Sequence, residues 1–247
     1  MGSCKVLSCL PLFLCWGSFL NVVAFRLVRD EPLTNPSHCP HCQTTIRWYD
    51  LVPLVSWIAL RGRCRTCRGS ISPLYPLIEL ATAVLMCALA QVASPAQFVP
   101  YFVLFSALIA NTRSDLETML ISRATTLFLI PIGLACSAMG LLSISLMDSI
   151  AGTLLGSALL YGISRTFRYL TRQDGLGQGD IDLIALIGAF TGITGAWWSL
   201  TSASILGSAI GIAYLLISGK GRTTHIPFGP FLAAGCISYV LFGQYWL

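Results

Sequence analysis

Long apolar runs dominate this sequence and leave few folds open to it. The hydrocarbon core of a bilayer is about 30 Å thick, and a helix of about 20 apolar residues crosses it. On that measure the chain offers eight candidate spans, at residues 6–25, 74–94, 98–112, 124–144, 149–164, 181–195, 199–218 and 227–245. Only Ala196, Trp197 and Trp198 separate the sixth span from the seventh, so that boundary is the least defined.

The composition excludes a soluble globular domain. Charged residues make up 10% of the chain and hydrophobic residues 55%, whereas soluble domains carry about 25% charged residues. Membrane β-barrels are built from strands that alternate apolar and polar residues, but runs such as 127–135 and 205–217 are apolar almost throughout. We therefore predict an all-α polytopic membrane protein with about eight transmembrane helices.

Basic residues are confined to alternate loops, and this orients the predicted bundle. They fall after the first, third, fifth and seventh spans, at Arg26, Arg29, Arg47, Arg61, Arg63, Arg65, Arg68, Arg113, Arg123, Arg165, Arg168, Arg172, Lys220 and Arg222. Lysine and arginine stay on the cytoplasmic side, so both termini should face outward, with Lys5 as the exception. The net charge of +5 then reports topology and gives no reason to invoke nucleic acid. A cleaved signal peptide over residues 1–25 is the alternative, but no small-residue cleavage site precedes Arg26.

A single sizeable segment, residues 26–73, separates the first span from the second and is predicted to be cytoplasmic. It is too small to build its own core and needs a staple. Two C-x-x-C pairs supply one, since Cys39, Cys42, Cys64 and Cys67 can place four thiolates around a structural Zn²⁺. The alternatives are disulfides or a redox couple, and a cytoplasmic location argues against structural disulfides. His38 and His41 are expected to be exposed loop residues, with replacement of one cysteine ligand as the lesser alternative.

Two acidic sites stand at the mouths of spans. Asp180 ends the run Gly177-Gln178-Gly179-Asp180, and Asp115 follows the apolar run 98–110. Carboxylates at the edge of a membrane are functional by default. Held close together, one stays protonated while the other is charged, which suits an aspartic protease. Gly177 and Gly179, with Gly175, are expected to let backbone approach backbone and to free the chain from regular helix just before Asp180.

Each carboxylate also has a plainer interpretation. Asp115 could be a solvated loop residue paired with Arg113 or Arg123, and Asp180 could favour a helix N-terminus through the macrodipole. Asp182 could replace Asp180 in the pair, because both lie at the same span mouth. Glu117 and Asp174 are expected to be surface acids. Glu79, inside the second span, should either pair with an arginine of residues 61–68 or orient the cysteine segment.

Five blocks of the sequence resemble those of bacterial type IV prepilin peptidases, a family of G-x-G-D membrane aspartic proteases. They lie in the family's order at residues 17–27, 39–80, 115–119, 177–180 and 226–231. The resemblance implies cleavage of the short basic leader of type IV prepilins or pseudopilins, at the cytoplasmic face of the bacterial inner membrane. It also implies Asp115 and Asp180 as the catalytic dyad. Which pilin is cut, and for which system, stays open.

Many members of that family also methylate the new N-terminus with S-adenosylmethionine. A Gly-basic pair before the second cysteine knuckle is associated with this activity, and Gly62 and Arg63 match it. An acidic residue after the first span is also implicated, which could be Asp30 or Glu31. From the residues alone, Gly62 and Arg63 are equally well a tight turn with a solvated side chain.

The chain departs from the family pattern near both aspartates. Ser122 and Arg123 stand where a proline and then Asp or Asn are usual, and Asp182 stands where a basic residue is common. Another carboxylate beside Asp180 disfavours a second negative charge there, so we expect Asp182→Lys to shift the pH optimum of cleavage.

The expected organisation is a first span at 1–25, a zinc segment at 26–73 and a peptidase bundle at 74–247. Two other functions compete with the bifunctional peptidase. A proton-coupled transporter would use the same carboxylates as relays, but it leaves the cysteines unexplained. A peptidase-only or catalytically weakened member acting in assembly is suggested by the departures, and its intact pair of aspartates argues against it.

Overall fold

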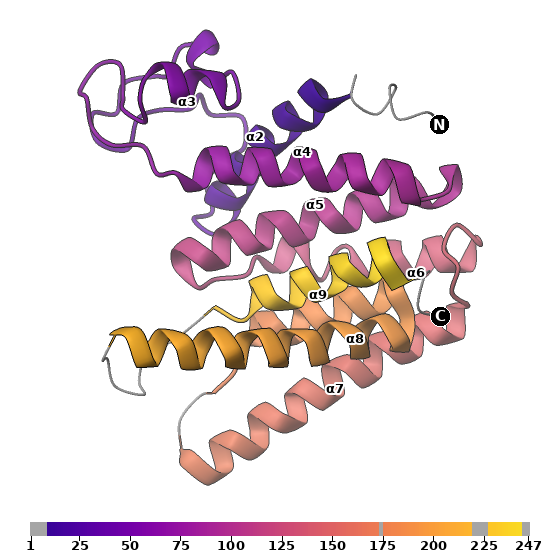
Figure 1. The fold of residues 1–247 in the computed structure, drawn as a ribbon. Coiled ribbons are helices and arrows are strands. Elements are labelled where there is room, and N and C mark those ends of the chain that lie inside the picture. Colours follow the sequence, from indigo (N-terminus) through magenta and orange to yellow (C-terminus); the bar gives the residue numbers. More distant parts are fainter. Residues whose placement is uncertain (1–8, 173–174, 219–226, 244–247) are drawn as a thin grey trace. The chain divides into compact units, whose positions relative to one another are not determined.

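The computed structural model describes residues 9–172, 175–218 and 227–243, and within them the chain is helical (Figure 1). The chain divides into two compact units, residues 1–92 and residues 93–247. The described α-helices are α2 (Leu10–Leu27), α3 (Val55–Ala59), α4 (Leu74–Val92), α5 (Pro95–Thr118), α6 (Ile130–Ala138), α7 (Leu146–Thr171), α8 (Gln178–Ser218) and α9 (Gly229–Phe242). Two short 3₁₀ helices, η1 (Trp48–Leu51) and η2 (Arg123–Thr125), lie in the loops.

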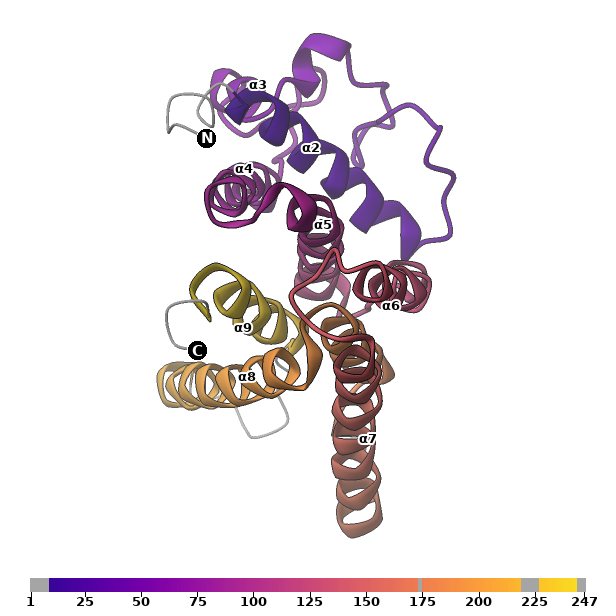
Figure 2. The ribbon, with the colours of Figure 1, turned by 90° about the vertical axis from the view of Figure 1, so that its right-hand side faces the viewer.

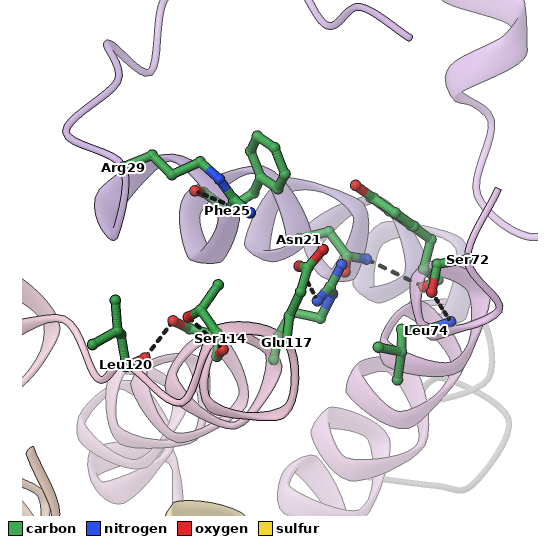
Figure 3. A network of polar contacts seen from close by, with 11 residues as sticks. Asn21, Phe25, Arg29, Ser72, Leu74, Ser114, Glu117 and Leu120 are labelled. Atoms are coloured by element: carbon green, nitrogen blue, oxygen red, sulfur yellow. Dashed lines mark hydrogen bonds and ion pairs between the residues drawn. The ribbon is translucent and has the colours of Figure 1, made fainter. Parts of the chain in front are cut away.

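In the N-terminal unit, α2 packs along α4. The close approach depends on Gly17, where an added Cβ would lie 2.8 Å from the Cα of Glu79. Asn21 is almost fully buried, and its amide donates to the carbonyl of Tyr75 at 3.2 Å (Figure 3). A buried polar side chain that is hydrogen-bonded in this way fixes the register of two apolar helices.

The segment between α2 and α4 has little regular structure. Arg26, counted above only as a topology signal, is 5% exposed, and its guanidinium binds the carbonyls of Pro32, Leu33 and Pro36. These bonds hold the start of the segment against the end of α2. Five fixed donors in a planar group suit an arginine to gathering several carbonyls.

The C-terminal unit is built around α8, which packs against α6, α7 and α9 (Figure 2). Its first part is enclosed on all sides: Leu183, Ile184, Leu186, Ile187 and Phe190 are at most 1% exposed. An all-round apolar sequence therefore belongs to a helix buried in protein rather than to one facing lipid.

A kink divides α8 at Gly192, whose φ of 70° and ψ of −168° are not helical. We expected the boundary at residues 196–198, and that position was wrong, because the chain is helical there. The N-terminus of α7 holds the kink: Asp148 Oδ1 accepts the amide of Ile193 at 3.2 Å, and Ser149 donates to the carbonyl of Ala189. The break is thus set by contacts from another helix.

The all-helical class is confirmed, and the number of crossings stays a prediction. Four helices in the described residues are long and apolar enough to cross a membrane, namely α2, α4, α7 and residues 178–214 of α8. The predicted span at 124–144 contains only a short helix, α6, whose N-terminus carries Pro131 and which is followed by Gly140 at φ +69°. Lys5, Lys220 and Arg222, three of the charges used for orientation, lie outside the described residues.

Candidate active site and candidate metal centre

Asp115 lies in the last turn of α5 and is 5% exposed. Its Oδ2 accepts a hydrogen bond of 3.0 Å from the backbone N–H of Gly229, the first residue of α9. The two arginines that were alternative partners are engaged elsewhere, since Arg113 binds Glu117 at 2.6 Å and Arg123 binds Asp182. Asp115 is therefore a buried carboxylate held by a helix N-terminus, and the solvated-loop interpretation does not fit it.

Asp180 lies in the first turn of α8 and is 9% exposed. Ile121 brings the surroundings of the two aspartates together: its side chain packs over Gly179, next to Asp180, and lies beside Gly229, whose N–H binds Asp115. The two carboxylates therefore stand in the same region of the unit although 65 positions separate them. The first-turn position also satisfies the macrodipole interpretation, which by itself does not explain a second buried carboxylate nearby. Two desolvated acids brought together from separate helices are typical of a catalytic pair.

Asp182 does not take the place of Asp180 beside Asp115. Its Oδ2 lies 3.5 Å from Nε of Arg123, and its Oδ1 accepts from the amide of Gln178 at 3.3 Å. Asp180 and Asp182 have different neighbours because residues two positions apart on a helix point to different faces. Glu117 pairs with Arg113 and keeps a third of its side chain exposed, which agrees with a surface acid (Figure 3).

Of the two uses expected of the glycines before Asp180, release from the helix does not fit Gly179, whereas a need for close approach does. Helix α8 already begins at Gln178, so Gly179 is part of the first turn. An added Cβ on Gly179 would lie 2.7 Å from the Cβ of Ile121, closer than real side chains approach. On Gly177 the same atom would meet Asp180 Oδ2 at an ordinary 3.4 Å. Position 179 therefore has no room for a side chain, whereas position 177 has room for a methyl group.

Sequence reasoning missed two residues at this site. Asn111 is 1% exposed and stands one helical turn before Asp115, and its Oδ1 accepts from the backbone of Ser122 and the hydroxyl of Thr125. The i, i+4 spacing of two polar residues at the end of an apolar run was an available signal. Gly229 lies in the closing block of the resemblance, but nothing local indicates that its amide binds an aspartate 114 residues earlier.

The four cysteines of the N-terminal unit converge. Their Sγ atoms all lie within 4.8 Å of one another, and those of Cys39 and Cys67 are 3.8 Å apart. A tetrahedral site with bonds of about 2.3 Å has sulfur–sulfur edges of about 3.8 Å. The donor set therefore fits a metal ion, and His38 and His41 are exposed residues outside the cluster.

The two knuckles repeat the same backbone pattern. The amide of Cys39 binds the carbonyl of Thr44, and the amide of Cys64 binds that of Gly69, five residues on in each case. A left-handed residue closes each turn, Gln43 at φ 57° and Arg68 at φ 61°. Two equivalent turns thus present two thiols each, which is how small metal-stapled segments are commonly built.

The surroundings of the cluster favour the thiolate at two of the four cysteines, Cys42 and Cys64. The Thr44 hydroxyl lies 3.4 Å from Cys42 Sγ and is the main cause that lowers the pKa of Cys42 to about 6. Asp50 and Arg65 form a two-pronged ion pair next to the second knuckle, at 2.6 and 2.9 Å, and this hydrogen bonding lowers the pKa of Asp50.

Backbone hydrogen bonds from Cys67 and Thr66 also lower the pKa of Cys64. Against the effect of the Gly69 backbone, desolvation and the neighbouring thiols raise the pKa of Cys67 to about 11. Cys42 and Cys64 are therefore the thiols that most easily take the thiolate form that ligates a metal.

Glu79 connects the cysteine segment to the first turns of α4. Its Oε2 accepts the backbone N–H of Leu54 at 2.9 Å, and Leu54 has a left-handed φ of 60°. Glu79 was expected either to pair with an arginine of residues 61–68 or to orient the cysteine segment. The hydrogen bond to Leu54 supports the second role. Gly62 is buried at φ +65°, with the ring of Trp57 2.9 Å from where a Cβ would stand, and Arg63 is exposed. The tight-turn interpretation of this pair fits that geometry.

Comparisons with known proteins match the chain along most of its length. A profile of the bacterial peptidase A24 N-terminal domain matches residues 12–93, and one of the type IV leader peptidase family matches residues 102–216. The chain is 36% identical to the prepilin leader peptidase/N-methyltransferase of Aeromonas hydrophila, over 90% of its own length and 86% of the relative's. It is 34% identical to the enzyme of the same name from Stutzerimonas stutzeri, over 97% and 91%.

A third relative is the type 4 prepilin-like proteins leader peptide-processing enzyme of Escherichia coli, at 34% identity over 91% of this chain and 89% of the relative. No solved structure matches the chain. These relatives are more than 30% identical to the chain and align along almost its whole length, which is enough to classify it. The two buried carboxylates lie in the part that the peptidase profile matches. The protein belongs to the type IV leader peptidase family.

Proposed function

We propose that this enzyme cleaves the basic leader from type IV prepilins or pseudopilins at the cytoplasmic face of the inner membrane, with Asp115 and Asp180 as its catalytic dyad. One observation carries the proposal: in a chain of this family, α5 and α8 each hold a buried carboxylate, and Ile121 packs both over Gly179, next to Asp180, and beside Gly229, which binds Asp115. A desolvated acid pair has no structural use that would offset the free energy of burying it.

The chemistry needs neither a metal nor a covalent intermediate. The ionised carboxylate takes a proton from water as the water attacks the scissile carbonyl, and the protonated carboxyl donates to the developing oxyanion. The N–H of Gly229 binds Asp115 and favours its charged form. We therefore assign Asp115 as the base that activates water and Asp180 as the acid that donates to the carbonyl oxygen.

We further propose that the cysteine cluster holds a structural Zn²⁺. Four soft thiolate donors at tetrahedral separations match the preference of this ion. A closed set of four protein ligands leaves no position for water or substrate, so the role is to fold residues 26–73 rather than to catalyse.

Methylation of the new N-terminus is the finer part of the proposal. The relatives' names include N-methyltransferase, and the methyl group would come from S-adenosylmethionine. Gly62 and Arg63 are the candidate residues, with Asp30 or Glu31 as the acidic partner. The exposed guanidinium of Arg63 beside a rigid turn suits recognition of a carboxylate.

The proposed topology has eight crossings, both termini outside and three parts: a first span at 1–25, a zinc segment at 26–73 and a peptidase bundle at 74–247. The kink at Gly192 supports two crossings within α8, because a continuous helix of 41 residues would be about 60 Å long, twice the hydrocarbon thickness. Prepilins and the bilayer are the expected partners, and no feature indicates nucleic acid.

The test is cleavage of a panel of prepilins in detergent by the parent, Asp115→Asn and Asp180→Asn. We expect both variants to lose cleavage while keeping their melting temperature and zinc content. Cleavage that survives either change would reassign the chemistry to Glu117 or Asp182. No cleavage by the parent, with every prepilin tested, would favour the assembly-factor or transporter alternative.

A further inference from the structure

The loop that follows Asp115 is attached to both catalytic helices. We call residues 119–126, the first part of the connection from α5 to α6, the linking loop. On the α5 side, Ser114 donates to the carbonyl of Leu120 (Figure 3), and Asn111 accepts from Ser122 and Thr125. Both anchoring residues lie on α5 within the turn that leads to Asp115. The loop cannot move without disturbing that turn.

On the other side, the linking loop contacts the first turn of α8. Arg123 pairs with Asp182 at 3.5 Å, and the Ile121 side chain fills the space over Gly179. Ile121 also lies 3.2 Å from where a Cβ on Gly229 would stand. These contacts bracket Asp180 in sequence, one residue before it and two residues after it.

Direct packing between α5 and α8 is sparse compared with the packing of either helix on α9. The relative position of the two aspartates therefore depends on what bridges them. Asp182 is 7% exposed, and a carboxylate buried to that extent needs a cationic partner. Arg123 supplies the charge from a side chain that is 71% exposed, so the guanidinium reaches in from solvent.

We propose that the Arg123–Asp182 ion pair is a positioning element that sets the separation of Asp115 and Asp180 through the linking loop. Neither residue touches the reacting atoms in this account; the pair acts on the dyad through the backbone of the loop and of α8. The inference rests on the proposed peptidase function, because the dyad is what the pair positions.

The pair also joins the two departures from the family pattern noted in the sequence. An arginine replaces the usual Asp or Asn after the first aspartate, and an aspartate replaces the common basic residue after the second. Each change alone would place a charge without a partner at the site. Together they form one ion pair in this chain, so a pair with the two charges exchanged should also work.

The experiment is a charge-swap cycle with Arg123→Asp, Asp182→Lys and the double variant. We expect each single variant to lower kcat by about tenfold to a hundredfold with little change in KM, because displacing a catalytic group by about 1 Å has effects of that size. The double variant should recover to within about threefold of the parent, since additivity fails for residues in contact. Arg165→Asp, an exposed arginine of α7, is the control for net charge and should cleave like the parent.

Three results would overturn the inference. These are single variants that cleave like the parent, a double variant no better than the product of the single effects, and losses confined to KM. Melting temperatures and zinc content of each variant separate misplacement from unfolding. If the parent cleaves no prepilin, the proposed function fails. In that case the positioning inference is rejected with it, and recovery of the melting temperature in the double variant would show an ion pair that only stabilises the fold.

Discussion

The amide of Gly229 donates to Oδ2 of Asp115 across 3.0 Å, and this bond joins the N-terminus of α9 to the last turn of α5. The first N–H groups of a helix lack partners within the helix, so they bind anions readily. The position also has no room for a side chain. A Cβ on residue 229 would lie 2.8 Å from the same carboxylate oxygen.

Gly229→Ala should therefore damage catalysis more than folding. The added methyl displaces the Asp115 carboxylate, and we expect kcat to fall by about a hundredfold, as for other displacements of about 1 Å. Gly207→Ala is the matched control, because its Cβ would meet its nearest neighbour at an ordinary 3.4 Å. Cleavage kinetics and melting temperatures of both variants check the prediction. Equal kcat in the two variants would contradict it.

The two glycines of the G-x-G-D run should differ in tolerance. Gly179→Ala forces a contact of 2.7 Å with the Cβ of Ile121, which cannot rotate away because that atom is fixed to the backbone. Gly177→Ala makes only an ordinary contact. We expect a loss of cleavage of about tenfold or more for the first and within about threefold for the second, by the same displacement argument. The reverse order, measured at equal zinc content, would exclude this account.

The sequence predicts helix positions well where hydropathy alone decides them. The expected span 74–94 corresponds to α4 at Leu74–Val92. Helix α5 extends past the apolar run 98–112 at both ends, because a capping box at Ser94 and Gln97 starts it earlier and polar residues continue it to Thr118. Hydropathy does not register either effect. The extension matters, because it is what carries Asp115 on a helix rather than in a loop.

The parts of the site that the sequence could not supply are long-range contacts. Spacing cannot show that Asp115 meets Asp180, and the resemblance alone paired them. The bond from Gly229 and the pairing of Arg123 with Asp182 join residues more than 50 positions apart. The cysteine cluster could be predicted from the sequence, because two local C-x-x-C turns define the ligands before any tertiary contact forms.

Removing the metal should unfold the cysteine segment and leave the C-terminal unit intact. Residues 26–73 have few buried apolar side chains, so their order depends on the metal. We expect a chelator, or Cys39→Ser, to abolish bound zinc and expose the segment to protease. Cys15→Ser, a cysteine of α2 outside the cluster, is the control. Unchanged proteolysis of residues 26–73 after verified loss of zinc would count against a structural role.

Glu79 should hold the segment to α4 independently of the metal. Glu79→Leu removes the acceptor of the Leu54 amide, whereas Glu79→Gln keeps an oxygen in the same place. We expect the leucine variant to increase hydrogen exchange at residues 52–60 while zinc stays bound, and the glutamine variant to resemble the parent. A buried backbone N–H that is left without an acceptor destabilises the fold by about 1–3 kcal/mol. Identical exchange in both variants would show that the contact is dispensable.

The kink in α8 should be a stability determinant set by α7. At Gly192 the left-handed φ disfavours any side chain, and a Cβ would lie 2.1 Å from Oδ2 of Asp148. Asp148 in turn accepts the amide of Ile193 and so caps the second part of α8. Loss of such a cap destabilises by about 0.5–2 kcal/mol. Asp148→Ala should therefore lower the melting temperature, and Gly192→Ala should lower it further, since it adds strain to the lost contact.

Gly162→Ala, with open space around its Cβ in the same α7 helix, supplies the control for these two variants. It should raise stability slightly, by about 0.5–1 kcal/mol, because alanine favours a helix more than glycine does. Thermal unfolding in detergent at matched lipid content measures all three. If Gly192→Ala proved as stable as Gly162→Ala, α8 would be continuous through residue 192. The proposal that α8 crosses the membrane twice would then lose its support. A lowered melting temperature for Gly192→Ala and Asp148→Ala alone ties the bend to the contact between α7 and α8.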